Sequence, residues 1–104
     1  MPTIYGVNVS EKKYKEYRRI KNNIRRTKLQ LQKVLKKCRR YSNTIHRKEC
    51  YEETKRKYIN QLIGHYKKEY VFLRNMLVDA GVTSRTAMRA RLNTIAKILF
   101  VLGA

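Results

Sequence analysis

The fold is decided by the stretch from Tyr17 to Tyr41, which reads YRRIKNNIRRTKLQLQKVLKKCRRY. Within it, one set of side chains recurs at alternating steps of three and four residues, and Thr27 is its only clearly polar member. The set consists of Tyr17, Ile20, Ile24, Thr27, Leu31, Val34, Cys38 and Tyr41. Alternating steps of this kind place all members on one face of an α-helix, as in a coiled coil. The spacing predicts a helix over 11–41, with Ser10 as its N-cap.

The sequence beyond this stripe predicts two further helices. Residues 42–44 are Ser, Asn and Thr, which favour turns and caps over helix interiors. A second apolar stripe then predicts a helix over 45–80, in which Gly64 suggests a kink or a close helix approach. Gly81 predicts the end of that helix, and a third apolar face predicts a helix over 84–101.

The expected fold class is therefore all-α. It is a long, antiparallel, coiled-coil-like helical hairpin with a shorter C-terminal helix, forming one basic domain over 11–104. Residues 1–10 form a short N-terminal arm, which we expect to be extended and without a strand to pair with.

The charge of the chain is strongly positive. Its 104 residues include 26 lysines and arginines against 7 aspartates and glutamates, a formal net charge of +19. Residues 11–41 hold 14 of the basic residues and only 2 of the acidic ones. Such an excess destabilises a compact chain by self-repulsion, and it favours an anionic partner. It argues against a free enzyme for small molecules and against an acidic disordered tail.

The basic residues of the first helix follow the same heptad as its stripe. With Tyr17 at heptad position a, positions b and c point away from the stripe, and seven of these eight positions are basic. They are Arg18, Arg19, Arg25, Arg26, Lys33, Arg39 and Arg40. We call the six arginines among them the arginine ladder. Because the planar guanidinium fork matches phosphate oxygens, the ladder predicts contact with the phosphate backbone of RNA or DNA. The alternative is a merely solvated helix face.

A short segment resembles the turn and recognition-helix start of helix-turn-helix DNA-binding proteins. It runs from Ala80 to Arg89 and reads AGVTSRTAMR. The resemblance implies that Ser84, Arg85, Thr86 and Arg89 face the DNA major groove. It covers about ten residues, and it departs from the pattern at Arg91, where an apolar residue is expected. The alternative is an ordinary corner between two helices.

Other candidate chemistry is limited. Cys38 and Cys50 flank the predicted turn, and together with His46 and His65 they suggest either a zinc site or a disulfide, although a buried free thiol at Cys38 is the simpler interpretation. No nucleophile motif, glycine-rich phosphate loop or carboxylate pair occurs, so we expect no enzyme, no catalytic residue, no metal and no cofactor. Tyr5, Tyr14 and Tyr51 lie outside the stripes and are candidates for base stacking.

These features predict a small basic nucleic-acid-binding protein, a structural component of a ribonucleoprotein or a virus particle. One alternative is a structural or regulatory protein that binds other proteins, or a second copy of itself, through the 17–41 stripe or the apolar tail over 98–102. Another is a DNA binder that uses residues 80–92. The start of the sequence lacks the pattern of a signal peptide, and no apolar run is long enough to span a bilayer, so we expect an intracellular protein that is not secreted.

Overall fold

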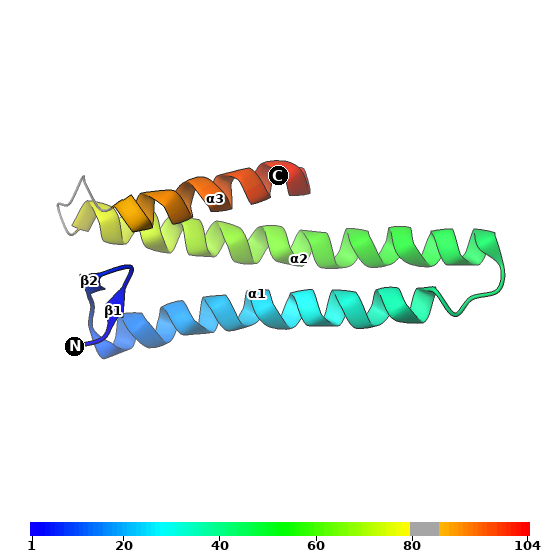
Figure 1. Cartoon of the computed structure of the whole chain (residues 1–104), viewed down its shortest axis with the longest axis horizontal. Coiled ribbons are helices and arrows are strands. Elements are labelled where there is room, and N and C mark those ends of the chain that lie inside the picture. Colours follow the sequence, from blue (N-terminus) through cyan, green and yellow to red (C-terminus); the bar gives the residue numbers. More distant parts are fainter. Residues whose placement is uncertain (80–85) are drawn as a thin grey trace.

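The computed structural model describes residues 1–79 and 86–104. Three helices dominate it: α1 over Glu11–Cys38, α2 over Thr44–Asp79 and α3 over Thr86–Leu102. Helices α1 and α2 lie side by side and antiparallel, and α3 runs along the C-terminal half of α2 (Figure 1). The molecule is a rod with extents of 56 × 25 × 16 Å. The predicted all-α hairpin with a shorter C-terminal helix is confirmed.

The core is built from the predicted stripes. Tyr17, Ile24, Thr27 and Cys38 of α1 are buried. On α2 the buried residues include Leu62, Tyr66 and Leu73, and on α3 they are Met88, Leu92 and Ile95. The apolar stripe of α1 is therefore covered by α2 of the same chain, because the turn between them brings the two stripes together.

The helix ends depart from the sequence prediction by a few residues. Helix α1 ends at Cys38 rather than at residue 41, because the chain tightens there into bonds from the Arg40 N–H to the Lys37 carbonyl and from the Tyr41 N–H to the Cys38 carbonyl. Asn43 caps α2, since its side-chain oxygen accepts hydrogen bonds from the backbone N–H groups of Ile45 and His46. Ser10 caps α1 as expected, accepting from the Lys13 N–H at 3.2 Å.

The N-terminal arm corrects the expectation of an unpaired strand. Strands β1 (Thr3–Ile4) and β2 (Val7–Asn8) pair with each other as an antiparallel hairpin. Tyr5 and Gly6 form its two-residue turn with positive φ angles of 48° and 80°, the conformation that such tight hairpins require. Ile4 and Val9 are buried, so the arm closes the open end of the helical hairpin.

Gly64 marks neither a kink nor a close approach. Helix α2 runs through it without a break, and a Cβ atom at this position would meet no neighbour within 4 Å. Among the described residues, no helix is both long and apolar enough to cross a membrane.

Candidate nucleic-acid interface

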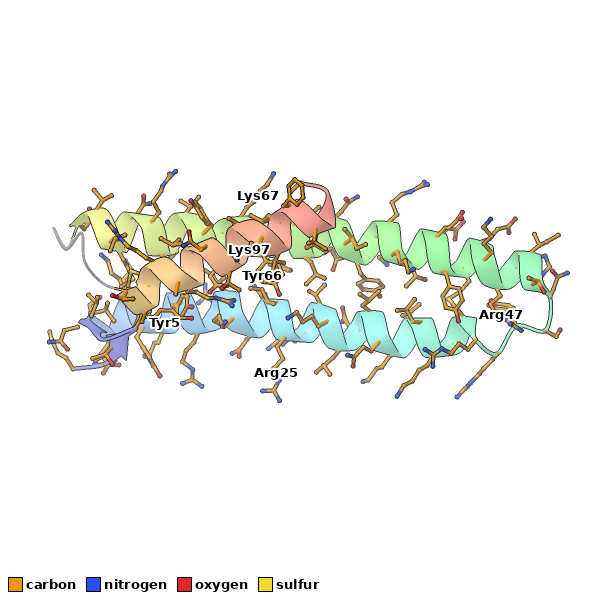
Figure 2. The ribbon with its side chains drawn as sticks, turned by 45° about the horizontal axis from the view of Figure 1, so that its top comes forward. Tyr5, Arg25, Arg47, Tyr66, Lys67 and Lys97 are labelled. Atoms are coloured by element: carbon orange, nitrogen blue, oxygen red, sulfur yellow. A yellow bond between two sulfur atoms is a disulfide. The ribbon has the colours of Figure 1, made fainter. Side chains whose placement is uncertain are left out.

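The arginine ladder lies on the face of α1 that points away from α2. Every ladder arginine, and Lys33 with them, is exposed, whereas the opposite face of the helix supplies the core. Figure 2 shows Arg25 extending from α1 away from the rest of the molecule. Local folding explains this placement: burial of the a and d positions against α2 turns positions b and c outward.

The ladder is divided into two groups, which corrects the picture of one continuous row. Arg18, Arg19, Arg25 and Arg26 project from α1, and we call them the helical arginines. Arg39 caps the C-terminus of α1 and Arg40 lies in the turn beyond it. Between the two groups, positions b and c hold only Gln32 and Lys33. The helical arginines therefore form the denser cationic surface.

Three of the four helical arginines border an open depression in the surface of α1. Its volume is about 300 Å³, and it is lined by Lys15, Arg18, Arg19, Asn22, Asn23 and Arg26. All of these side chains can donate hydrogen bonds to phosphate oxygens, and the two amides can also accept them. No carboxylate lines the depression. Its chemistry therefore favours an anion with several oxygen acceptors.

None of the ladder arginines forms an ion pair within the described part of the chain. The basic partners in the observed ion pairs are Lys13, Lys21 and Arg91. Arg18 instead places its guanidinium 6.0 Å from the centre of the Tyr14 ring, which holds it near the helix surface without neutralising it. The positive charge of the helical arginines is thus available to an external anion.

A disulfide between Cys38 and Cys50 fixes the hairpin end where Arg39 and Arg40 lie. The expectation of free cysteines is therefore wrong. A zinc site with these ligands is excluded as well, because both thiols are already bonded to each other. Arg47 adds a second tie by donating from Nε and Nη2 to the Tyr41 carbonyl, at 3.2 and 2.9 Å. Because disulfides are rare in reducing compartments, this bond bears on the expected intracellular location, which stays a prediction.

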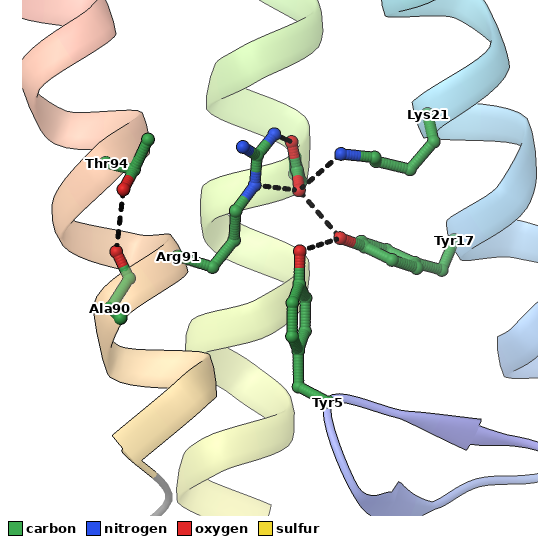
Figure 3. Close-up of polar contacts among 7 residues, drawn as sticks. Tyr5, Tyr17, Lys21, Ala90, Arg91 and Thr94 are labelled. Carbon is green, nitrogen blue, oxygen red and sulfur yellow. Dashed lines mark hydrogen bonds and ion pairs between the residues drawn. The ribbon is translucent and has the colours of Figure 1, made fainter.

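A buried charge cluster lies away from the ladder and was not foreseen from the sequence. Glu69 of α2 is completely buried. Arg91 of α3 binds it with two hydrogen bonds, of 2.9 Å from Nε and 2.8 Å from Nη2, and Tyr17 of α1 donates a third of 2.7 Å (Figure 3). Lys21 lies 3.8 Å away, and the Tyr5 hydroxyl contacts that of Tyr17 at 3.4 Å. The cluster therefore joins the N-terminal hairpin to all three helices.

The electrostatics of this cluster favour ionised Glu69. Burial alone would raise the pKa of its carboxyl, but the hydrogen bonds from Arg91 and Tyr17 and the charge of Lys21 outweigh burial and lower it. Burial, with the adjacent carboxylate, raises the pKa of Tyr17. At Lys21 burial dominates and lowers the pKa despite the attraction of Glu69, so we regard Arg91 as the main partner. The buried carboxylate of Glu69 is thus the shared counter-charge of Arg91 and Lys21.

This cluster also explains the departure from the helix-turn-helix pattern at Arg91. The position does pack beneath α3, as that pattern requires, but its neighbour is a buried carboxylate and not an apolar side chain. Thr86 and Arg89 of the resembling segment are exposed. Ser84 and Arg85 lie outside the described residues.

The remaining sequence candidates divide between core and surface. Tyr5 packs edge-to-face on the Tyr17 ring at 6.3 Å, so it belongs to the core and is a poor candidate for base stacking. Tyr14 and Tyr51 are half-buried. In the apolar tail, Ile98, Leu99 and Leu102 pack against the core, whereas Phe100 and Val101 are 84% and 82% exposed.

Comparison with known proteins finds no match to a protein family, to a curated protein or to a solved structure. The function must therefore be argued from the residues of this chain.

Proposed function

We propose that the protein binds nucleic acid through the phosphate backbone, and that the helical arginines of α1 make the principal contacts. The observation that carries this proposal is a set of four exposed arginines on the face of α1 opposite the core, none of them in an ion pair with a described residue. An arginine that only solubilises a surface is commonly interspersed with acids. Here the depression beside three of the four arginines is otherwise lined by lysine and asparagine, and one carboxylate, Glu16, lines the adjoining groove with Arg19.

The same geometry favours backbone contact over sequence readout. Arginines on a convex helix surface reach phosphates, and such contacts position a protein without distinguishing bases. Arg39 and Arg40 extend the contact towards the hairpin end. We favour RNA as the ligand, in a ribonucleoprotein or a virus particle, because no element of the described chain presents a clear reader of the DNA major groove.

The test is the salt dependence of binding to an RNA hairpin and to a DNA duplex of unrelated sequences. Both should bind at about 50 mM salt, with affinities that fall steeply as salt rises. Changing Arg18, Arg19, Arg25 and Arg26 together to glutamine should lower the magnitude of the log–log slope by about 3 to 4 on B-DNA, since each lost phosphate contact removes about 0.9. The reduction should be similar for all sequences.

A matched control removes the same charge elsewhere. Lys48, Lys55, Arg56 and Arg74 are exposed on α2, and changing all four to glutamine should alter the slope much less. If the two quadruple variants behave alike, net charge rather than the helical arginines drives binding. Absence of binding to either nucleic acid at about 50 mM salt contradicts the proposal outright.

Two alternatives keep narrower support. Most of the 17–41 stripe packs against α2, which leaves less of it for a partner protein, whereas Phe100 and Val101 of the tail are exposed. The helix-turn-helix interpretation rests on the exposed Thr86 and Arg89. A preference for one DNA duplex that is lost on Arg89→Ala would favour it over backbone binding.

A further inference from the structure

A groove runs between α1 and α2 on the side of the pair that α3 leaves uncovered. Its volume is about 600 Å³, and no described residue of α3 lines it. Its lining spans Glu16 to Asn23 on α1 and Lys67 to Asn75 on α2. From the first to the last residue, stretches of eight and nine helical residues extend over about 10 to 12 Å. The groove is therefore as long as two turns of a helix laid beside the pair.

The floor of the groove is apolar and partly fixed in position. It is formed by Ile20, Val71 and Phe72. Val71 is 44% exposed, and Ile20 and Phe72 are half-buried. One face of the Phe72 ring stacks on Tyr17, with centroids 5.6 Å apart, so the core already orients this ring. Binding of an apolar side chain to this preformed surface therefore costs little side-chain entropy.

The rim of the groove is basic. Arg19 borders it from α1 and Lys67 and Lys68 border it from α2, against the single carboxylate of Glu16. A rim of this sign favours an occupant with acidic flanks and repels a second copy of the same strongly basic surface. A nucleic-acid backbone satisfies the rim but brings no apolar side chains to cover the floor. The combination of apolar floor and basic rim favours a protein segment.

We propose that the groove between α1 and α2 binds an acidic amphipathic helix of a partner protein. Apolar side chains spaced three and four residues apart would cover Ile20, Val71 and Phe72, and flanking glutamates or aspartates would face Arg19, Lys67 and Lys68. The bound helix lies on the opposite side of the pair from α3 and completes a four-helix bundle. Arg19 belongs to both this groove and the helical arginines, but the floor residues and the two lysines lie outside the arginine ladder, so this proposal does not depend on nucleic-acid binding.

The first test uses a labelled synthetic peptide of about 14 residues, or four helical turns. Leucines form one stripe on it and glutamates flank the stripe, whereas a comparison peptide has the same composition in an order without a stripe. Fluorescence anisotropy should show the striped peptide binding at least about tenfold more tightly. Equal affinity of the two peptides overturns the proposal, since charge alone then accounts for binding.

The second test changes the floor of the groove. Val71→Glu places a carboxylate among the apolar side chains and should weaken the striped peptide about tenfold or more. Val78→Glu is the matched control, because Val78 is also exposed on α2, at 72%, and does not line the groove. Both changes add the same negative charge, and circular dichroism checks that both variants keep their helices. Equal binding by the two variants overturns the proposal.

A charge exchange keeps the test decisive even if Val71→Glu unfolds the chain. Lys67→Glu combined with Lys68→Glu should weaken the glutamate-flanked peptide and strengthen a version flanked by lysines. Unchanged preference contradicts the proposed rim. If Val71→Glu weakens binding of single-stranded poly-uridine RNA by the same factor as binding of the peptide, the groove is a nucleic-acid site. If Val71→Glu abolishes a self-association seen by sedimentation, the groove is a contact between copies of this chain. Either result overturns the proposal.

Discussion

At the scale of single residues, Glu69 connects all three helices through one buried side chain. Its carboxylate accepts from Arg91 and Tyr17 and lies near Lys21, so one buried group holds three helices together. Glu69→Gln keeps the shape of the side chain but leaves Arg91 and Lys21 without a buried counter-charge. We expect a loss of about 3 kcal/mol in the free energy of unfolding, measured by urea denaturation.

The matched control for this change is an exposed carboxylate on the same helix. Glu52→Gln is expected to alter the free energy of unfolding by less than about 0.5 kcal/mol, as for most surface substitutions. A similar, small effect for both changes would mean that water, rather than Glu69, solvates the charges of Arg91 and Lys21.

The ionisation of Glu69 also predicts how stability depends on pH. The folded-state pKa of its carboxyl lies below the ordinary value of 4.5, so the unfolded chain takes up a proton at higher pH than the folded chain does. This contribution to stability is complete above pH 4.5 and is lost as the pH falls through the lower folded pKa. Thermal unfolding measured at a series of pH values should therefore show a falling midpoint below pH 4.5. The Glu69→Gln variant, which cannot titrate there, should show a shallower fall, and an identical fall in both proteins would assign the acid sensitivity to other carboxylates.

At the scale of secondary-structure elements, the Cys38–Cys50 disulfide ties the end of α1 to the first turns of α2. The bond encloses a short loop, since the two cysteines are 12 residues apart. Closing a loop of that size removes unfolded-state entropy worth about 3 kcal/mol. Reduction with dithiothreitol should lower the stability by about that amount and speed cleavage by trypsin after Arg39 and Arg40, because the loosened backbone can enter the protease. A Cys38→Ala, Cys50→Ala variant should not respond to the reductant. Unchanged stability on reduction would mean that helix packing alone holds the hairpin end.

The helices themselves could be predicted because one physical rule decides them. Long stripes at steps of three and four, without an internal proline, leave few alternatives to amphipathic helices, and burial of the stripe from Tyr17 to Cys38 follows directly. The N-terminal hairpin could not be foreseen in the same way, because it depends on a positive φ at Tyr5, a residue that rarely adopts it. The end of α1 at Cys38 could not be foreseen either, because it is set by local hydrogen bonds from the Arg40 and Tyr41 N–H groups that the stripe does not encode.

The Glu69 cluster shows what the spacing of apolar residues cannot predict, which is the pairing of charged side chains between helices. Glu69 lies three residues after Tyr66 and four before Leu73, both buried, so the spacing places a charge on the apolar stripe of α2. Arg91 lies in the same way between Met88 and Ile95 of α3. A negative residue on one apolar stripe and a positive residue on another indicate a buried ion pair. Pairing Glu69 with Arg91, however, requires knowing that α3 folds back along this part of α2. The exposure of the ladder, in contrast, followed from the heptad, and only its division at the end of α1 did not.

At the scale of the whole molecule, shape and charge act together. The Cα radius of gyration is 17.2 Å, well above the about 13 Å typical of a compact domain of 100 residues. A rod spreads the net charge of +19 over a greater distance than a sphere does, which lowers self-repulsion. The helical arginines nevertheless gather charge at one place, and their mutual repulsion is relieved only by counter-ions or by an anionic partner.

This repulsion predicts that added salt stabilises the free protein. Raising sodium chloride from about 10 mM to about 500 mM shortens the screening length from about 30 Å to a few ångströms. We expect the unfolding midpoint to rise by about 5 °C, the equivalent of about 1 kcal/mol for a domain of this size. The Glu69 cluster opposes this trend only weakly, because buried charges are screened little.

The variant with glutamine at the four helical arginines separates local from overall repulsion. It should unfold at a higher temperature than the parent at low salt and should gain less from added salt, because the densest cationic surface is gone. The control with four glutamines on α2 loses the same charge and should keep most of the salt response. If both variants respond equally, repulsion is a property of the net charge. If the helical arginines alone account for it, the surface that we propose to bind phosphate is also the one that destabilises the unbound protein, and an anionic partner stabilises the fold as it binds.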